Sequence, residues 1–130
     1  MELNITSAER QSTEAFRNLA YACIALSNDY WSWQKEMAAH TAGKSRLMNA
    51  VAIIIKQHNL LAYKARGLVK GLALEYEKKL MDMRDELFSV GTMSEDMRKY
   101  IDAVILMVAG NAVWGSTCPR YNKDLYFSLS

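Results

Sequence analysis

The sequence contains few residues that break helices or cross-link a chain. Its 130 residues include one proline, six glycines and two cysteines. Cys23 lies among apolar residues, and no histidine or cysteine stands at the spacing of a zinc site from it. We therefore expect Cys23 and Cys118 to be free thiols in a reducing compartment, with a disulfide as the alternative.

Long apolar runs and an excess of one charge are also missing. The longest apolar run covers residues 103–109, well short of the about 20 residues that span a bilayer. The start, MELNITSAER, has neither the basic region nor the apolar run of a secretory signal. Sixteen basic and 14 acidic residues leave a net charge of +2, which does not by itself favour nucleic acid or a membrane surface. These features predict a soluble, cytoplasmic protein with no nucleic acid partner and no membrane span.

Strand patterns and the common catalytic loops are absent as well. No segment has the apolar period of a strand, and there is no glycine-rich phosphate loop, nucleophile elbow or internal repeat. A chain that is 51% hydrophobic and 23% charged suits a compact unit. Helical spacing of apolar residues recurs along most of the chain. We therefore predict an all-α helical bundle, with residues 1–130 as a single helical unit.

Four helical segments are expected. The first has an N-cap at Ser7 and continues without a break to about Thr41. The second covers about residues 45–57. The third is the most clearly amphipathic, and its predicted inward face consists of Ala65, Leu68, Val69, Leu72, Tyr76, Leu80, Met83 and Leu87. The fourth has an N-cap at Ser94 and ends at Pro119; residues 103–109 are apolar nearly all round it, so they should be buried.

The main candidate for a functional site is the stretch NDYWSWQKE, at residues 28–36, which contains several polar and charged side chains. On an α-helix, Asn28, Ser32 and Glu36 lie within about 80° of one another around the helix axis, and so share one face. Lys35 lies at the edge of this face. The same row continues backward through the apolar residues Phe16, Ala20 and Ile24. Polar atoms on such a face need partners, and Mg²⁺ takes oxygen ligands while a lysine suits phosphate. The alternative is a polar helix face with Glu36 in water and Ser32 bonded to its own helix.

A second candidate segment ends the last helix. Asn111 extends the row of Ala103 and Met107, and Trp114 extends the row of Leu106, so a buried amide and a large aromatic should lie near the helix end. A pocket wall and ordinary core packing both explain them. The same choice stays open for Tyr30, Trp31 and Trp33.

Both segments resemble the class I terpene cyclases. NDYWSWQKE is similar to the family's second metal-binding motif, the Asn/Ser/Glu motif, and most of all to the form of this motif in the fungal members. The resemblance implies that Asn28, Ser32 and Glu36 ligate one Mg²⁺ of a trinuclear cluster and that Lys35 contacts the substrate diphosphate.

Residues 110–121, GNAVWGSTCPRY, are similar to the family's late helix, which ends in an Arg-Tyr pair. By that resemblance, Arg120 donates hydrogen bonds to the diphosphate with Tyr121 beside it, and Asn111 and Trp114 line the substrate pocket. The family usually has a serine directly after the tryptophan, where this chain has Gly115.

The implied function is that of a terpene cyclase, which ionises a prenyl diphosphate with Mg²⁺ and cyclises the carbocation to a terpene hydrocarbon or alcohol. The resemblance covers only the later helices of the class I terpenoid synthase fold, and the family's aspartate-rich first metal motif has no counterpart here. The acidic residues of segment 82–86 fall on the polar side of their helix. We therefore expect the C-terminal portion of a cyclase domain, partnered by the missing N-terminal half or by a second copy. The alternative is a catalytically inactive truncated cyclase that acts as a helical interaction or ligand-binding module.

Overall fold

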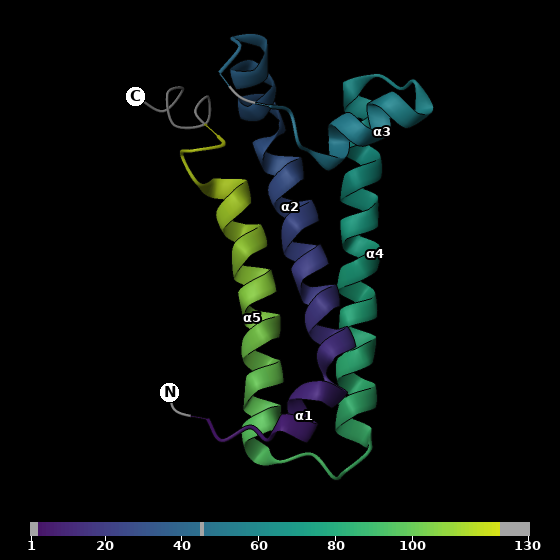
Figure 1. Cartoon of the computed structure of the whole chain (residues 1–130), viewed down its shortest axis with the longest axis vertical. Helices are drawn as coiled ribbons and strands as arrows, with labels where there is room; N and C mark the ends of the chain where they lie inside the picture. Colours follow the sequence, from purple (N-terminus) through teal and green to yellow (C-terminus); the bar gives the residue numbers. More distant parts are fainter. Residues whose placement is uncertain (1–2, 45, 123–130) are drawn as a thin grey trace.

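The computed structural model describes residues 3–44 and 46–122 (Figure 1). The elements in these ranges are α1 (Ser7–Ser12), α2 (Glu14–Thr41), α3 (Ala50–His58), α4 (Ala62–Ser89) and α5 (Glu95–Thr117). No strand occurs in the described ranges. The prediction of an all-α fold is confirmed.

The long helix predicted from Ser7 to Thr41 is wrong at its start. The N-cap is Thr6, which forms a capping box with Glu9. The first helix, α1, ends at Ser12, and the chain changes direction at Thr13 before α2 begins. The buried hydroxyl of Thr13 donates to the carbonyl oxygens of Glu9 at 3.0 Å and Arg10 at 3.2 Å. Such a side-chain bond to the backbone competes with helix propagation. As a result α1 lies across one end of the bundle and α2 begins a new direction (Figure 1).

The long helix α2 lies between α4 and α5 (Figure 1). It packs extensively against both, whereas α4 and α5 have far less contact with each other. The main core cluster is shared by these helices and comprises Phe16, Ala20, Cys23, Leu80, Met97, Ile101, Val104 and Val108. The apolar row that precedes the NDYWSWQKE motif on α2 therefore faces the core, as predicted.

The short helix α3 begins later than predicted. The expected start at Ser45 lies outside the described residues, and residues 46–49 are not helical. Asn49 is the N-cap, because its side chain accepts a hydrogen bond from the backbone N–H of Val51. A second core cluster forms where α3 covers the end of α4, from Trp33, Val51, Ala65 and Val69. For Trp33, 7% exposed, core packing is therefore the correct alternative.

The last helix, α5, is less buried than its composition predicts. Ser94 caps it as expected, accepting a hydrogen bond from the N–H of Met97. Val104 and Val108 are buried, but Leu106 is 72% exposed and Met107 is 49% exposed. Among the described residues, α5 packs mainly against α2 along one face, so its other sides stay uncovered. Leu68 of α4, predicted to face inward, is exposed as well, so this prediction is wrong.

Both cysteines are buried free thiols, as predicted. Burial raises the pKa of Cys23 to about 11, and the negative charge of Glu77 adds to the effect. No helix in the described ranges combines the length and the hydropathy that a bilayer span requires.

Candidate metal and diphosphate site

The centre of the site is a pair of side chains one helical turn apart on α2. The hydroxyl of Ser32 donates to Oε1 of Glu36 at 2.9 Å. Ser32 is 4% exposed and Glu36 is half-buried. Ser32 thus bonds within its own helix, as the alternative expected, but its partner is a side chain, and the Glu36 carboxylate is partly buried instead of lying in water.

The second oxygen of Glu36 is held from the start of α3. Nδ2 of Asn49 donates to Oε2 of Glu36 at 2.8 Å and to the carbonyl oxygen of Asp29 at 3.0 Å. Asn49 is 2% exposed. Its role was not predicted, although an asparagine directly before an apolar helical run is a recognisable N-cap signal.

Asp29, next to Asn28 in the motif, anchors α3 rather than joining the candidate ligands. Its Oδ2 accepts a hydrogen bond from the backbone N–H of Ala50 at 2.9 Å. Burial raises the pKa of Asp29, the hydrogen bond from Ala50 opposes this, and the charge of Glu36 raises it further. The start of α3 is thus tied to α2 through both Asp29 and Asn49.

The two candidate segments meet through a pair of amides. Nδ2 of Asn111, on α5, donates to Oδ1 of Asn28, on α2, at 3.2 Å. Asn111 is half-buried and bonds to a side chain, not to backbone as core packing would predict. The motif side chains therefore spread across α2, with Asn28 toward α5 and Glu36 toward α3.

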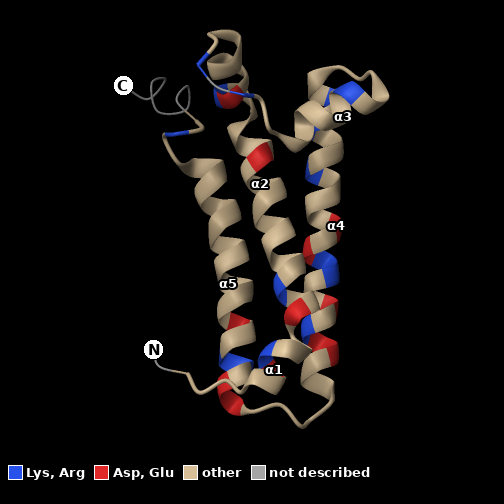
Figure 2. Ribbon diagram, in the orientation of Figure 1, with Lys and Arg blue, Asp and Glu red and all other residues tan. Residues whose placement is uncertain are grey.

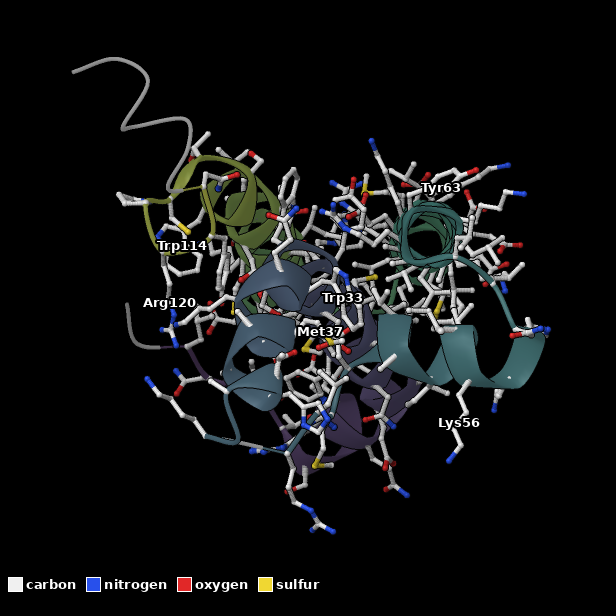
Figure 3. The ribbon with its side chains drawn as sticks, turned by 90° about the horizontal axis from the view of Figure 1, so that it is seen from above. Trp33, Met37, Lys56, Tyr63, Trp114 and Arg120 are labelled. Carbon is white, nitrogen blue, oxygen red and sulfur yellow. The ribbon has the colours of Figure 1, made fainter. Side chains whose placement is uncertain are left out.

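The end of α5 carries the aromatic and cationic candidates. The rings of Trp114 and Tyr121 meet edge to face, 5.5 Å apart at an interplanar angle of 80°. The guanidinium carbon of Arg120 lies 5.8 Å from the ring centre of Tyr121, and Figure 3 shows Arg120 on the same side of the molecule as Trp114. Trp114 is 49% exposed because its side of α5 is uncovered, so the alternative of a core tryptophan is wrong and the pocket-wall role stays a prediction.

The turn that presents Arg120 is held by Asn122, another residue that was not predicted. Its Nδ2 donates to the carbonyl oxygens of Gly115 at 2.9 Å and Cys118 at 3.0 Å. These carbonyls belong to the last turn and the C-cap of α5, which have no partner within the helix. No local sequence signal in the stretch after Pro119 predicts this role of Asn122.

Trp31 fills the contact between α2 and the end of α5. A Cβ placed on Gly115 would lie 2.7 Å from Cδ1 of Trp31. On its other side Trp31, with Tyr30, lines a groove of about 170 Å³ between α2, α4 and α5, whose wall also includes Ala73, Leu74 and Ala112. Trp31 therefore acts as a wall residue, whereas Trp33 belongs to the core.

Two of the predicted residues stand apart from this network. Lys35 and Arg120 are both exposed. In residues 3–44 and 46–122, neither makes a hydrogen bond or ion pair with Asn28, Ser32 or Glu36. The structure thus joins Asn28 to Asn111 and Ser32 to Glu36, and leaves the two cations directed to solvent.

The donors fit a hard cation. No cluster of three or more His, Cys, Asp or Glu side chains that could hold a metal occurs in the described part of the chain. A metal here would rest on an amide, a hydroxyl and a carboxylate oxygen, from Asn28, Ser32 and Glu36. Oxygen donors of this kind suit Mg²⁺, Ca²⁺ or Mn²⁺ better than softer metals.

The fold and the site together define an all-α bundle that carries oxygen donors on its central helix. Comparison with known families is more specific. The model of terpene synthase family 2, C-terminal metal binding, matches residues 1–79. The chain belongs to this family, and the matched region includes the whole NDYWSWQKE motif.

Individual relatives match nearly the full chain. Fusicoccadiene synthase of Phomopsis amygdali is 33% identical over 127 residues, which is 97% of this chain and 18% of that protein. Terpene cyclase ATR13 of Stachybotrys chlorohalonatus is 28% identical, over 98% of this chain and 34% of its own length. Sesterterpene synthase btcA of Colletotrichum orbiculare is 27% identical, over 94% of this chain and 17% of that protein. The chain thus spans between 17% and 34% of these relatives.

Proposed function

We propose that this chain forms the later, metal-binding helices of a class I terpene cyclase domain. One observation carries the proposal. In a member of this family, the hydroxyl of Ser32 and the carboxylate of Glu36 adjoin on the central helix, and Asn28 of the same motif lies one turn before Ser32, bonded to Asn111. The proposed reaction is the Mg²⁺-dependent ionisation of a prenyl diphosphate, followed by cyclisation to a terpene hydrocarbon or alcohol.

Asn28, Ser32 and Glu36 are the proposed Mg²⁺ ligands. Bound Mg²⁺ would supply Lewis-acid stabilisation of the departing diphosphate. Before a metal arrives, the Ser32 hydroxyl and the Asn49 amide already hold the two carboxylate oxygens of Glu36. The fold therefore fixes the orientation of the Glu36 carboxylate before a metal binds.

Lys35 and Arg120 are the proposed diphosphate donors, with Tyr121 beside Arg120. Both cations are exposed and take no part in the ion pairs of the described residues, so their charges are available to an anion. An arginine can donate two parallel hydrogen bonds to a phosphate, and donors fixed by the protein stabilise charge that develops on a leaving group.

Asn111 and Trp114 are the proposed substrate-pocket residues. Asn111 holds the amide of Asn28 at 3.2 Å, so it also orients a proposed metal ligand. Trp114 presents an aromatic ring, steadied by its edge contact with Tyr121, and an aromatic face attracts a cation. The pocket would be completed by the earlier helices of a cyclase domain, which carry the aspartate-rich motif in the family, or by a second copy.

A second candidate function is a non-catalytic helical module that binds a protein or a ligand. The observation that favours it is the uncovered apolar side of α5, where Leu106, Val113 and Trp114 are 72%, 63% and 49% exposed. Exposed apolar surface of this kind marks an interaction site.

The deciding experiment is a product assay on the purified chain with Mg²⁺ and prenyl diphosphates of several lengths. Hydrocarbon is read by gas chromatography, and released diphosphate is measured in parallel. Glu36→Gln should abolish Mg²⁺-dependent turnover, and Glu75→Gln, on an exposed site of α4, should leave it unchanged.

If the chain alone is inactive, the assay is repeated with a cyclase segment that carries the aspartate-rich motif. Turnover that survives Glu36→Gln would disprove the proposed metal site. No turnover under either condition would favour the non-catalytic module.

A further inference from the structure

Asn49 makes an unusually complete set of contacts for a residue in a connecting segment. Its Nδ2 donates to Oε2 of Glu36 at 2.8 Å and to the carbonyl of Asp29 at 3.0 Å, and its Oδ1 accepts from the N–H of Val51 at 2.8 Å. A primary amide has two N–H donors and one carbonyl oxygen. Both donors and the oxygen of the buried Asn49 amide are therefore in use.

The contacts to Glu36 fix the orientation of its carboxylate. Ser32 donates to Oε1 and Asn49 donates to Oε2, so rotation of the carboxylate would break both hydrogen bonds. Oε1, which lies beside the Ser32 hydroxyl, is then the oxygen best placed to share a cation with Ser32. A ligand held in one orientation loses less conformational freedom when it binds.

Asn49 is itself fixed from two sides. Its Oδ1 is bound to the first turn of α3, and its backbone neighbour Ala50 donates to the carboxylate of Asp29 at 2.9 Å. Asn49 is therefore a rigid link between the start of α3 and the candidate ligand on α2, and its position does not depend on the Glu36 contact alone.

We propose that Asn49 is a positioning residue for the metal site. It acts through Glu36 and does not touch the metal; this inference rests on the proposed function, because it takes Glu36 as a metal ligand. Hydrogen-bond partners of ligands are a recognised determinant of metal affinity, and their loss typically weakens it by about 10- to 100-fold.

The variant that tests this proposal must keep the helix cap. Asn49→Ser does so, because serine is a good N-cap residue, but its shorter side chain has no amide N–H to offer Glu36. Ser94→Ala is the matched control. It removes the cap of α5, at the opposite end of the bundle (Figure 1), without touching the candidate site.

The measurement is Mn²⁺ binding to the full chain, read from the electron paramagnetic resonance signal of free Mn²⁺, with urea unfolding of each variant in the absence of metal. Mn²⁺ prefers the same oxygen ligands as Mg²⁺. We expect Asn49→Ser to weaken Mn²⁺ binding by about tenfold or more. The Glu36→Gln variant should bind Mn²⁺ more weakly than Asn49→Ser does. Ser94→Ala should lower the urea midpoint and leave Mn²⁺ affinity unchanged.

The outcomes separate the two proposals. In one outcome the unaltered chain binds Mn²⁺, and Glu36→Gln weakens this binding but Asn49→Ser does not. The positioning role of Asn49 is then wrong, and the proposed metal site is supported. If Ser94→Ala weakens binding as much as Asn49→Ser, the effect is general destabilisation and the positioning role is again wrong. If the unaltered chain binds no Mn²⁺, or Glu36→Gln binds it equally well, the metal site itself is wrong and the inference falls with it.

Discussion

Among the glycines of the described residues, Gly115 has the least room for a side chain. A Cβ there would lie 2.7 Å from Cδ1 and 3.1 Å from Cγ of Trp31, and a contact below 3.0 Å requires something to move. The indole of Trp31 is rigid, and its own edge contact with Tyr30 limits where it can go. The glycine that stands where terpene cyclases usually have serine is thus explained by the packing of Trp31 against α5.

Alanine at two glycines of the same helix tests this explanation. Gly115→Ala should lower the free energy of unfolding by about 1–3 kcal/mol, because the added methyl overpacks the Trp31 contact. Gly110→Ala, where nothing lies within 4 Å of the added Cβ, should raise it by about 0.5–1 kcal/mol, since alanine is the better helix former. Urea denaturation followed by circular dichroism measures both. Equal changes at the two positions would show that Trp31 does not restrict Gly115.

The helices predicted best were those defined by local residue patterns. The apolar spacing of α4 and the Ser94 cap of α5 involve residues three or four apart, and the sequence alone was sufficient to predict them, except for the inward place given to Leu68. The bend at Thr13 was missed because a threonine hydroxyl can bond to solvent or to its own backbone, and the pattern of residues does not decide between them. The burial of residues 103–109 was overestimated because it depends on what covers α5.

In the candidate site, too, local features were predicted and contacts between distant parts of the chain were not. Helical spacing correctly placed Ser32 and Glu36 on one face, where they bond to each other. The contact of Glu36 with Asn49 depends on how the chain turns after α2, and the contact of Asn28 with Asn111 joins residues 83 positions apart. Spacing within one helix contains no information on either. The roles proposed for all of these residues in metal, diphosphate and substrate binding, and for Lys35, Arg120 and Tyr121, stay predictions.

The carboxylate of Glu9 joins α1 to the N-cap of α5. Glu9 accepts hydrogen bonds from the Ser94 hydroxyl at 2.6 Å and from the Ser94 N–H at 3.2 Å. The Ser94 hydroxyl is the main reason that the pKa of Glu9 lies below its ordinary value, with further hydrogen bonds from the Ser94 and Thr6 backbone acting in the same direction against a smaller effect of burial. Because the folded pKa is the lower one, Glu9 stabilises the fold above its ordinary pKa of 4.5 and loses this effect as the pH falls through the folded value.

Comparison of the unaltered chain with Glu9→Gln tests this pH dependence. The unaltered chain should have the higher free energy of unfolding at about pH 7, and the difference should shrink steadily at pH values below about 4.5. Urea unfolding at a series of pH values gives the difference directly, and the other carboxylates cancel between the two proteins. A difference that is constant with pH, or that grows in acid, would contradict the assigned role of Glu9.

The uncovered side of α5 is a property of the whole molecule. Between Asp102 and Arg120 the chain has no charged residue, and Figure 2 shows this part of α5 without acidic or basic colours. Leu106, Met107, Val113 and Trp114 are all at least 49% exposed along it. A contiguous apolar surface on a small protein favours association.

We therefore expect the 14.8 kDa chain to self-associate as its concentration rises, and sedimentation velocity to show it. Leu106→Lys and Val113→Lys should suppress the association, because each would bury a charge in the interface. Met48→Lys, which replaces an even more exposed side chain outside α5, is the matched control. A monomer at every concentration, or an equal effect of Met48→Lys, would show that α5 is not the associating surface.

The central place of α2 also determines how the chain can assemble. α4 and α5 are neighbours in sequence, separated only by residues 90–94, yet each packs more extensively against α2 than against the other. Pairing of α4 with α5 alone therefore gains little, and most of the stabilising contacts form only when a helix from the first third of the chain is enclosed by helices that follow it. Contacts between distant parts of a chain slow folding, because the intervening loop must close before they form. During synthesis α2 emerges before α4 and α5, and the contact between Asn28 and Asn111 can form only after α5 has been made.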